Sequence, residues 1–488
     1  MTYIRASALG CALDCDLRTG KNKHGDGPAT DDGPRINAAM AGASAGNPIT
    51  LIIDGSALIS GLFLPAGGYW SIAGLGCGTG FFLKSGMNND GIHNGPPDAV
   101  KINDPGWPVP PRGRNVSLSN FTINGNGGDG HNGVSTTGLR YGTDKVWFCS
   151  INLISLDNVS LENLVVVNSP AFHVRLSNVG NVTASGCVLQ SEPSFTDGLH
   201  FDGPANDISI SNCRFATGDD SIALNCPEGY SGDISRVKVT GCTFNSFSLM
   251  RLYTTAGGVH FRIRNVTVSD CTGISTEAAF PIGFVNNGYP NAIADLTVSN
   301  CVLTGPTVFG VSESFGTIRA SGVTFFPTPF NWGDQPNHAS GFLRPSPAPN
   351  GITPWVGSNL ILENCKMVRR ESTEVAAIIF EAQSRIDSLE FNGFAVHQAG
   401  FSDPAAALLS LGPGSITQLV LNSLDSSHID AVVGSPGFAG IGTVAGQGVL
   451  ATLWPFPDAV MADGVPYISA TTGLPSIKVA GIVESYSP

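Results

Sequence analysis

Short segments in which apolar and polar residues alternate recur along the chain. Each ends with Asn, Gly or Asp followed by one apolar residue, most often Cys; examples are residues 158–164 (NVSLENL), 207–213 (DISISNC), 265–271 (NVTVSDC) and 295–301 (DLTVSNC). Alternation with a period of two is typical of half-buried strands, whereas helical repeats would show a period of 3.6 residues. The pattern therefore predicts an all-β chain of short strands joined by sharp turns.

The spacing of these segments predicts how the strands are arranged. Between Cys187 and Cys301 the terminal Cys recurs every 26, 29, 29 and 30 residues, the length of one coil in a solenoid whose coils stack on each other. We therefore expect a right-handed parallel β-helix, a solenoid of roughly ten coils that lie about 4.8 Å apart.

The end of each segment has a physical explanation. A sharp bend between two sheets needs a left-handed backbone, which Gly, Asn and Asp adopt at the least cost. The cysteines that follow share one position of the coil, so they should form an inward ladder of buried free thiols. These are Cys187, Cys213, Cys242, Cys271, Cys301 and Cys365. Cys11 and Cys15 are the close pair that could instead form a disulfide.

The two ends of the chain differ from its middle. Residues 25–40 (GDGPATDDGPRINAAM) contain an Asp suited to a helix N-cap and a Pro suited to the first turn. They predict a short N-terminal helix that covers the open end of the solenoid. We expect an N-terminal cap with the first coils (1–100), a main parallel β-helix with the catalytic cleft (101–400) and a C-terminal β-rich tail (401–488).

Two long interruptions of the repeat are rich in Gly, Pro and aromatic residues, namely residues 124–150 and 327–358. We expect them to overhang the side of the solenoid, where loops commonly form the walls of binding sites. Aromatic side chains in such loops can stack on sugar rings, and the candidates are Trp107, Trp147, Trp332 and Trp355.

Composition excludes several classes of protein. The chain has 25 Lys and Arg against 38 Asp and Glu, a net charge of −13, so a basic face for nucleic acid is not expected. A hydrophobic content of 42 % argues against disorder. No run of 18 apolar residues predicts a transmembrane helix, and no apolar signal-peptide core is visible at the start. We therefore expect neither a nucleic-acid nor a membrane partner.

Three carboxylates break the repeat in two successive coils. Asp197 lies in FTDGLHFD (195–202), and Asp219 and Asp220 lie in TGDDSIALN (217–225), 22 residues or one coil later. Like charges on neighbouring rungs raise at least one carboxyl pKa, so that an acid and a base are available together, as hydrolysis of a glycosidic bond requires. A calcium site and a set of turn-capping aspartates are the alternatives that the spacing leaves open.

Strand alternation supplies further candidates for substrate binding. In residues 199–202 (LHFD) the apolar side chains point inward, so His200 and Asp202 should face the cleft beside Asp197. The same argument turns Arg251 and Tyr253 outward on a neighbouring rung.

The motifs around the three aspartates resemble those of the polygalacturonase family of glycoside hydrolases, within the pectin-degrading β-helix superfamily. TDG at 196–198 and GDDSIALN at 218–225 are similar to the family's NTDG and GDDCIAIN signatures, and the segment at 25–32 is similar to the opening of the superfamily. The resemblance implies an inverting mechanism without a metal or other cofactor. In it, Asp219 is the general acid, and Asp197 and Asp220 activate the attacking water.

The chain departs from that family in its cations. Family members carry Gly-His-Gly on the next coil and Arg-Ile-Lys on the one after, and these cations bind the carboxylate of the substrate. Here residues 245–253 contain no His, and no Lys or Arg occurs between Arg264 and Arg319. An acidic protein without this clamp would repel galacturonan. We therefore expect a neutral polysaccharide or oligosaccharide, such as an α-linked glucan.

Two other functions stay open at this stage. The first is a calcium-dependent polysaccharide lyase that uses Arg251 as its base. The second is a phage tail-spike protein that binds or depolymerises glycans. The hydrolase is expected to be a monomer and a tail spike a homotrimer. Each of these functions places the protein outside the cell or on a virion.

Overall fold

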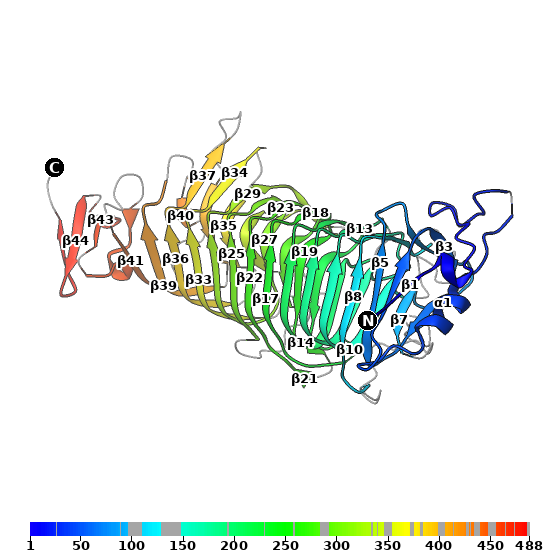
Figure 1. The fold of residues 1–488 in the computed structure, drawn as a ribbon. Coiled ribbons are helices and arrows are strands. Elements are labelled where there is room, and N and C mark those ends of the chain that lie inside the picture. Colours follow the sequence, from blue (N-terminus) through cyan, green and yellow to red (C-terminus); the bar gives the residue numbers. More distant parts are fainter. Residues whose placement is uncertain are drawn as a thin grey trace. The chain divides into compact units, whose positions relative to one another are not determined.

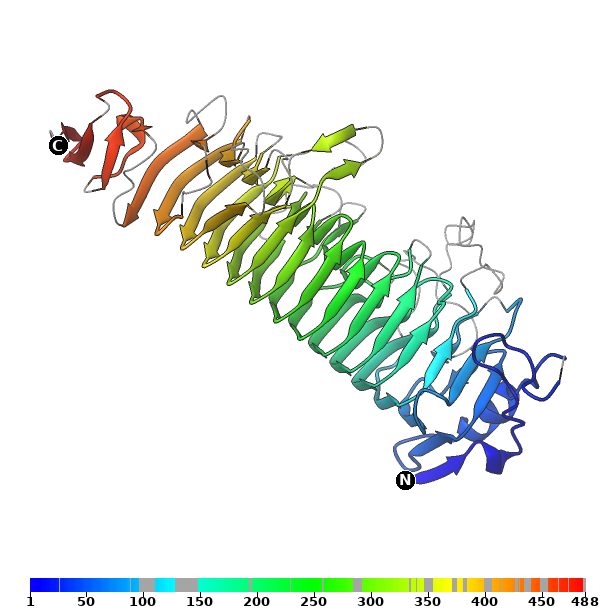
Figure 2. The same ribbon diagram turned by 90° about the horizontal axis from the view of Figure 1, so that it is seen from above.

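The computed structural model describes the chain except for residues 26, 88, 96–109, 128–147, 193–194, 229, 257–258, 284–291, 333–334, 339, 346–353, 371–374, 381–383, 399–405, 413, 426–428, 430, 434–439, 448–454, 464, 473 and 486–488. It forms two compact units, Met1–Ile263 and Arg264–Pro488. In each unit short parallel strands follow one another in coils, as a right-handed parallel β-helix (Figures 1 and 2). The predicted fold is confirmed.

The first unit contains two parallel sheets. In one sheet lie β1 (Thr2–Arg5), β2 (Ile49–Ile53), β4 (Leu62–Leu64), β5 (Gly68–Gly74), β7 (Ile92–Asn94), β8 (Gly113–Ser119), β10 (Ile151–Glu162), β12 (Val174–Ser185), β14 (Leu199–Ser211), β16 (Asp220–Asn225), β17 (Ile234–Thr240) and β19 (Ser248–Tyr253). In the other lie β3 (Ser56–Ile59), β6 (Gly80–Leu83), β9 (Thr122–Asn124), β11 (Val165–Val167), β13 (Val188–Ser191), β15 (Arg214–Thr217) and β18 (Thr243–Ser246). β20 (Thr255–Ala256) and β21 (Val259–His260) pair as a short antiparallel ladder.

The second unit repeats this arrangement. Its larger sheet holds β22 (Ile263–Ser269), β24 (Ala278–Ile282), β25 (Ile293–Ser299), β27 (Thr307–Val311), β28 (Phe315–Ser321), β32 (Gly341–Pro345), β33 (Val356–Glu363), β35 (Val375–Ile379), β36 (Arg385–Asn392), β38 (Ala406–Ser410), β39 (Ser415–Asn422), β40 (Ala431–Val433) and β41 (Ile441–Gln447). Its smaller sheet holds β23 (Thr272–Ser275), β26 (Val302–Gly305), β29 (Thr324–Pro327), β34 (Lys366–Arg369) and β37 (Ala395–Gln398). β30 (Phe330–Trp332) and β31 (Gln335–His338) pair antiparallel, and a four-stranded sheet follows with β42 (Pro455–Phe456), β43 (Pro466–Ser469), β44 (Pro475–Val479) and β45 (Ile482–Ser485). Parallel pairing thus continues past residue 400 through β41, and β42 pairs with β43 in parallel as well.

The turn residues adopt the backbone conformation that the repeat predicts. In the first unit φ is +62° at Gly186, +53° at Asn212 and +64° at Gly241, and in the second it is +52° at Asn300. The cysteines that follow are buried and free, as the ladder requires. Cys11 and Cys15 are free as well, so the disulfide considered for them does not form.

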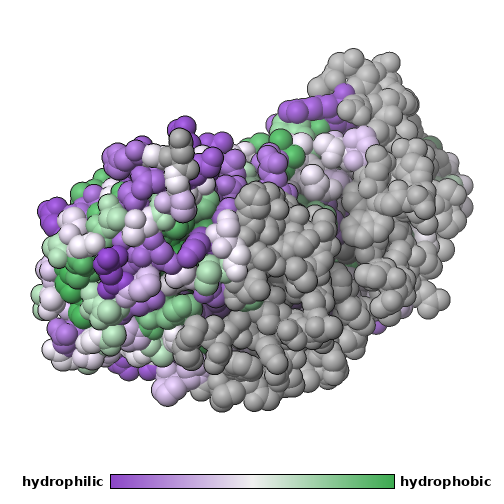
Figure 3. Space-filling view, turned by 90° about the vertical axis from the view of Figure 1, so that its right-hand side faces the viewer, coloured by the Kyte–Doolittle hydropathy of each residue, from purple (hydrophilic) through white to green (hydrophobic). Residues whose placement is uncertain are grey.

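A single α-helix, α1 (Gly33–Met40), lies at the N-terminal end of the described chain, with Pro34 in its first turn. Its buried residues include Ile36 and Met40. The side chain of Asp31 accepts a hydrogen bond of 3.1 Å from the N–H of Gly33, the first residue of the helix. The side chain of Asp32 does not cap the helix; it accepts hydrogen bonds from the backbone N–H groups of Ala12 and Leu13. Figure 3 shows hydrophilic and hydrophobic residues interspersed over the coloured part of this end.

Among the described residues, short 3₁₀ helices lie at η1 (Ser7–Leu9) and η4 (Asp458–Val460). No helix among the described residues is long and apolar enough to span a membrane.

One aromatic candidate for sugar stacking is wrong. Trp355 is fully buried and packs between Phe315 and Phe380, with ring centroids 5.6 and 5.5 Å away. Trp107 and Trp147 lie outside the described residues, as does the side chain of Trp332.

The left-handed turns yield a stability prediction. Asn212 has a φ of +53°. Alanine adopts this left-handed conformation at a higher cost than asparagine, because its side chain cannot form a local hydrogen bond. We therefore expect Asn212→Ala to lower the free energy of unfolding by about 1 kcal/mol. Asn212→Gly is the matched control and should cost less, because glycine adopts this conformation freely. Urea unfolding followed by circular dichroism measures both; equal losses in the two variants would contradict the account.

Candidate functional site

Two adjacent rungs of the first unit bring the three predicted aspartates together. Asp197 lies in the turn before β14, and Asp220 is the first residue of β16. The Gly198 N–H donates to the carbonyl of Asp220 over 2.9 Å, which aligns the rungs. Carboxylate oxygens of Asp197, Asp219 and Asp220 lie within 4.8 Å of one another.

A bend before β16 allows two consecutive aspartates to point to the same place. In a regular strand Asp219 and Asp220 would face opposite sides. The hydroxyl of Thr217 donates to the carbonyl of Asp219 over 2.9 Å, and the Gly218 N–H donates to the hydroxyl of Thr196 over 3.0 Å. These bonds hold the bend and connect it to the preceding rung.

The three carboxylates differ in exposure and in partners. Asp219 is half-buried, whereas Asp197 and Asp220 are only 4 % and 2 % exposed. Asp220 accepts a hydrogen bond of 2.6 Å from the hydroxyl of Ser248 and one of 2.5 Å from Nε of Arg251. Asp220 is therefore compensated by a guanidinium, and Asp219 is the member of the trio most open to a substrate.

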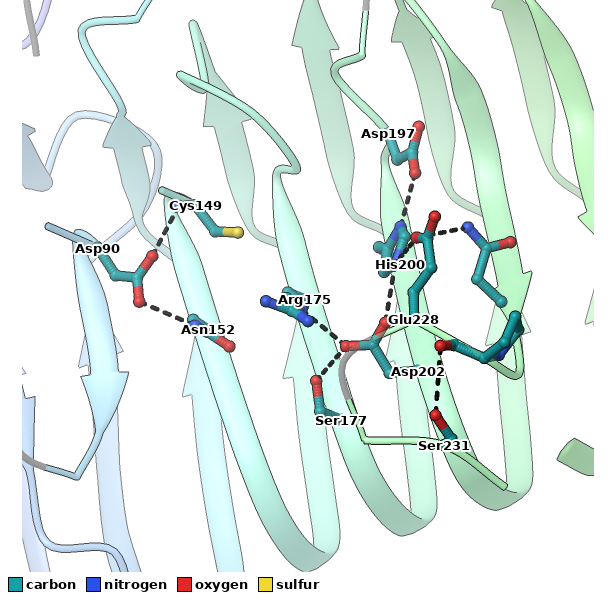
Figure 4. A network of polar contacts seen from close by, with 12 residues as sticks. Asp90, Cys149, Asn152, Arg175, Ser177, Asp197, His200, Asp202, Glu228 and Ser231 are labelled. Atoms are coloured by element: carbon teal, nitrogen blue, oxygen red, sulfur yellow. Dashed lines mark hydrogen bonds and ion pairs between the residues drawn. The ribbon is translucent and has the colours of Figure 1, made fainter. Parts of the chain in front are cut away.

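His200 is the partner of Asp197. Its Nδ1 lies 2.6 Å from Oδ2 of Asp197, and its Nε2 lies 3.1 Å from Oδ1 of Asp202 and 3.2 Å from Oε2 of Glu228 (Figure 4). Burial alone would lower the pKa of His200, but the hydrogen bonds to these carboxylates outweigh burial and raise the pKa well above its usual value. With a carboxylate at each ring nitrogen, these contacts favour the doubly protonated imidazolium form of His200.

Burial has the opposite consequence for Asp197. It raises the pKa of Asp197 to about 6, in spite of the hydrogen bond and the charge of His200, which lower it. Asp197 therefore changes its protonation state near pH 6, in the range in which a catalytic base is useful.

Asp202 contacts His200 at Nε2, the ring nitrogen that does not face Asp197. Its Oδ2 accepts hydrogen bonds from Nε of Arg175 over 2.7 Å and from the hydroxyl of Ser177 over 2.5 Å. Burial opposes ionisation, but Arg175 and His200 hold the pKa of Asp202 below its usual range.

The expected roles of His200 and Asp202 need correction. Both were expected to face the cleft, and both side chains are fully buried. Phe172 stacks on the His200 ring with centroids 3.8 Å apart, and Arg175 and Glu228 fill the space around Asp202 and His200. His200 thus lies between Asp197 and Asp202, and neither the His200 nor the Asp202 side chain is exposed on the surface.

Arg251 and Tyr253 lie where strand alternation places them. They occupy β19 opposite Ala223 and Asn225 of β16, and both are half-buried. Their side chains stay candidates for substrate contact, with Arg251 also bound to Asp220.

Sequence reasoning missed Arg175, Glu228 and Ser248. Arg175 is the register partner of His200 in β12, so strand alternation and the coil spacing could have found it. Glu228 lies in the loop after β16, where no periodic pattern exists.

In the described part of the chain, two groups of three side chains have a spacing that a cation could bridge. One is the aspartate trio, and the other consists of His200, Asp202 and Glu228. The charges of both groups are shared with Arg251, Arg175 and the imidazolium itself.

The site lies in a part of the chain that is similar to a known protein family. Residues 113–312 match the model of "Glycosyl hydrolases family 28". An exopolygalacturonase of Platanus acerifolia is 24 % identical over 228 residues, which are 45 % of this chain and 57 % of the relative. A probable polygalacturonase of Arabidopsis thaliana is 27 % identical over 200 residues, 35 % of this chain and 43 % of the relative. The chain thus spans about half the length of these curated relatives.

Solved structures show the same fold. The family 28 exopolygalacturonase of Yersinia enterocolitica has a TM-score of 0.53 at 12 % identity and covers 93 % of this chain and 79 % of its own. A tailspike mutant of E. coli bacteriophage HK620, in complex with a pentasaccharide, has a TM-score of 0.56 at 11 % identity, with 91 % and 78 % covered. At such identities the likeness establishes the right-handed parallel β-helix alone. Residues 113–312 of the chain are thus similar to glycosyl hydrolases family 28, and the curated relatives that they resemble include polygalacturonases.

Proposed function

We propose that the chain is a glycoside hydrolase that cleaves a glycosidic bond of a polysaccharide or oligosaccharide. The observation that carries the proposal is the trio of carboxylates on two adjacent rungs, within 4.8 Å of one another and each in a different environment. The match of residues 113–312 to glycosyl hydrolases family 28 supports it. A glycan substrate fits a protein that acts outside the cell or on a virion.

Each aspartate has one role in this proposal. Asp219 donates its proton to the glycosidic oxygen as the bond to the anomeric carbon breaks. Asp197 and Asp220 accept a proton from a water molecule, whose oxygen bonds to the anomeric carbon from the opposite face. One water is consumed, one sugar hydroxyl forms on each product, and the anomeric configuration inverts.

A lyase is less well supported by the geometry. Its base would have to be Arg251, whose Nε donates to Oδ2 of Asp220 over 2.5 Å. This pairing stabilises the protonated guanidinium, which therefore cannot accept a proton from a sugar ring carbon.

Charge at the site favours a neutral substrate, such as an α-linked glucan. The described cations around the trio are Arg175, His200 and Arg251, and each is already paired with a carboxylate. Five carboxylates face these three cations, because Asp202 and Glu228 add to the aspartate trio. An anionic sugar would meet an excess of negative charge. The names of the curated relatives favour galacturonan, so the choice has to be made by assay.

Removal of the proposed acid tests the catalytic assignment. We expect Asp219→Asn to lower kcat by at least about 100-fold, because the leaving oxygen then lacks a proton donor. Asp207→Asn is the control: this exposed aspartate lies on β14 and binds Arg236, away from the trio. Both variants are assayed for reducing sugar on the best substrate of the wild type. A loss of less than tenfold in Asp219→Asn would show that another group is the acid.

A glycan panel tests the substrate class. We expect higher kcat/KM on neutral α-linked glucans than on polygalacturonate, with reducing ends released and no unsaturated product absorbing in the ultraviolet. Equal turnover of polygalacturonate would refute the neutral-substrate proposal, and ultraviolet absorbance together with loss of activity in EDTA would identify a lyase.

The stereochemical course is tested separately. The nearest carboxylate oxygens lie within 4.8 Å, closer than the carboxyl separations of about 6.5–9.5 Å in inverting and about 5–5.5 Å in retaining enzymes. The proposal of inversion therefore rests on the family resemblance and not on spacing. Proton NMR of the first product formed should show the anomer opposite to the substrate; the same anomer would establish retention.

A further inference from the structure

A row of buried charged side chains lies behind Asp197 and takes no direct part in the proposed reaction. It consists of Arg175 on β12, His200 and Asp202 on β14, and Glu228 in the loop after β16 (Figure 4). Arg175, His200 and Asp202 have no exposed side-chain surface, and Glu228 is 25 % exposed. Buried charges are costly unless paired, so the row calls for an explanation beyond the stability of the coil.

His200 is the centre of this row. Carboxylates lie at both of its ring nitrogens, Asp197 at Nδ1 and Asp202 and Glu228 at Nε2. Phe172 stacks flat on the ring, with an interplanar angle of 8°. The ring therefore has one orientation, in which Nδ1–H points at the carboxylate of Asp197.

Other titratable groups around His200 and Asp197 have different partners. On neighbouring strands Arg251 binds Asp220 and Arg175 binds Asp202. On the preceding coils, burial lowers the pKa of His173 to about 4, so its neutral ring meets the backbone carbonyl of Asp197, and burial also raises the pKa of the Cys149 thiol well above its usual value. Tyr230, in the loop that carries Glu228, has a pKa raised to about 12 by burial. These three groups are uncharged near neutral pH, which leaves the His200 imidazolium as the cation that contacts Asp197 among the described groups.

Asp197 and Asp220 are held in different ways. Both oxygens of Asp220 accept strong hydrogen bonds, one from Ser248 and one from the Arg251 guanidinium. His200 engages a single oxygen of Asp197, Oδ2. A carboxylate with both oxygens bound to a hydroxyl and a guanidinium is a weak proton acceptor.

We propose that His200 is a positioning residue that orients and ionises Asp197 as the proton acceptor for the attacking water, with Asp202 and Glu228 holding its imidazolium in place. This inference rests on the proposed hydrolase function and divides the work between the two candidate bases. Asp220, bound by Ser248 and Arg251, orients the reacting groups.

The expected pH dependence follows from the sign of each charge. Activity requires ionised Asp197, so it should rise with pH through about 6 in the wild type. The cation of His200 lowers the pKa of Asp197, so His200→Gln should move this ascending limb to higher pH. The negative charge of Glu228 raises that pKa, so Glu228→Gln should move the limb to lower pH.

The experiment compares kcat and KM from pH 4 to 8 for the wild type, His200→Gln, Glu228→Gln and His93→Gln. His93 is the matched control, a buried histidine on β7 whose Nδ1 lies 3.0 Å from Asp90. We expect His200→Gln to move the limb upward by about one pH unit or more and to lower kcat about tenfold or more at pH 5, with KM nearly unchanged. His93→Gln should leave the limb in place.

A second measurement separates this inference from the proposed function. Nitrogen-15 NMR of the histidines in the wild type should show His200, assigned by its loss in His200→Gln, with both nitrogens protonated at pH 8. A neutral His200 ring at that pH would overturn the inference, even with full activity. A uniform loss of rate without a shift of the limb would show a purely structural role and also overturn it. If the wild type hydrolyses no glycan, the proposed function fails and the positioning role fails with it, while the NMR still decides whether the ion pair exists.

Discussion

Parallel backbone hydrogen bonding between successive coils is the constraint on which the rest of the molecule depends. Each coil must place its strands in register with the coil before it, so residues one coil apart in sequence become neighbours in space. In the first unit this brings Arg175 beside His200 and His200 beside Ala223. The catalytic residues in such a fold therefore come from several coils. Their relative positions depend on turns that keep the strands of successive coils in register. The left-handed Asn and Gly residues at these turns serve that purpose.

Much of the site could be predicted because it follows from this register. The interval between Asp197 and Asp219 equals one coil, and the structure brings both carboxylates together with Asp220. Alternation also placed His200 and Asp202 on the outward side of β14. Their burial could not be predicted, because the groups that cover them, Phe172 and Glu228, belong to turns and loops without periodicity.

The same limit explains the other differences. Asp32 directly precedes α1, but its side chain accepts hydrogen bonds from Ala12 and Leu13, which are 20 and 19 residues away. Trp355 lies near an interruption of the repeat, and its burial depends on Phe315 and Phe380 of other strands. In each case a long-range contact of an irregular segment decides the environment, and a single sequence does not encode that contact as a pattern.

The three aspartates are chemically identical, so any division of labour among them has to come from their neighbours. Asp220 receives a hydroxyl and a guanidinium from β19, Asp197 receives an imidazolium from its own strand, and Asp219 remains half-buried at the bend. Hydrolysis needs one carboxyl that keeps its proton and one that has lost it. At Asp197 burial raises the pKa to about 6, while the hydrogen bond and the charge of His200 lower it. The division between acid and base therefore depends on the different neighbours of each aspartate, which the register of the coils brings together.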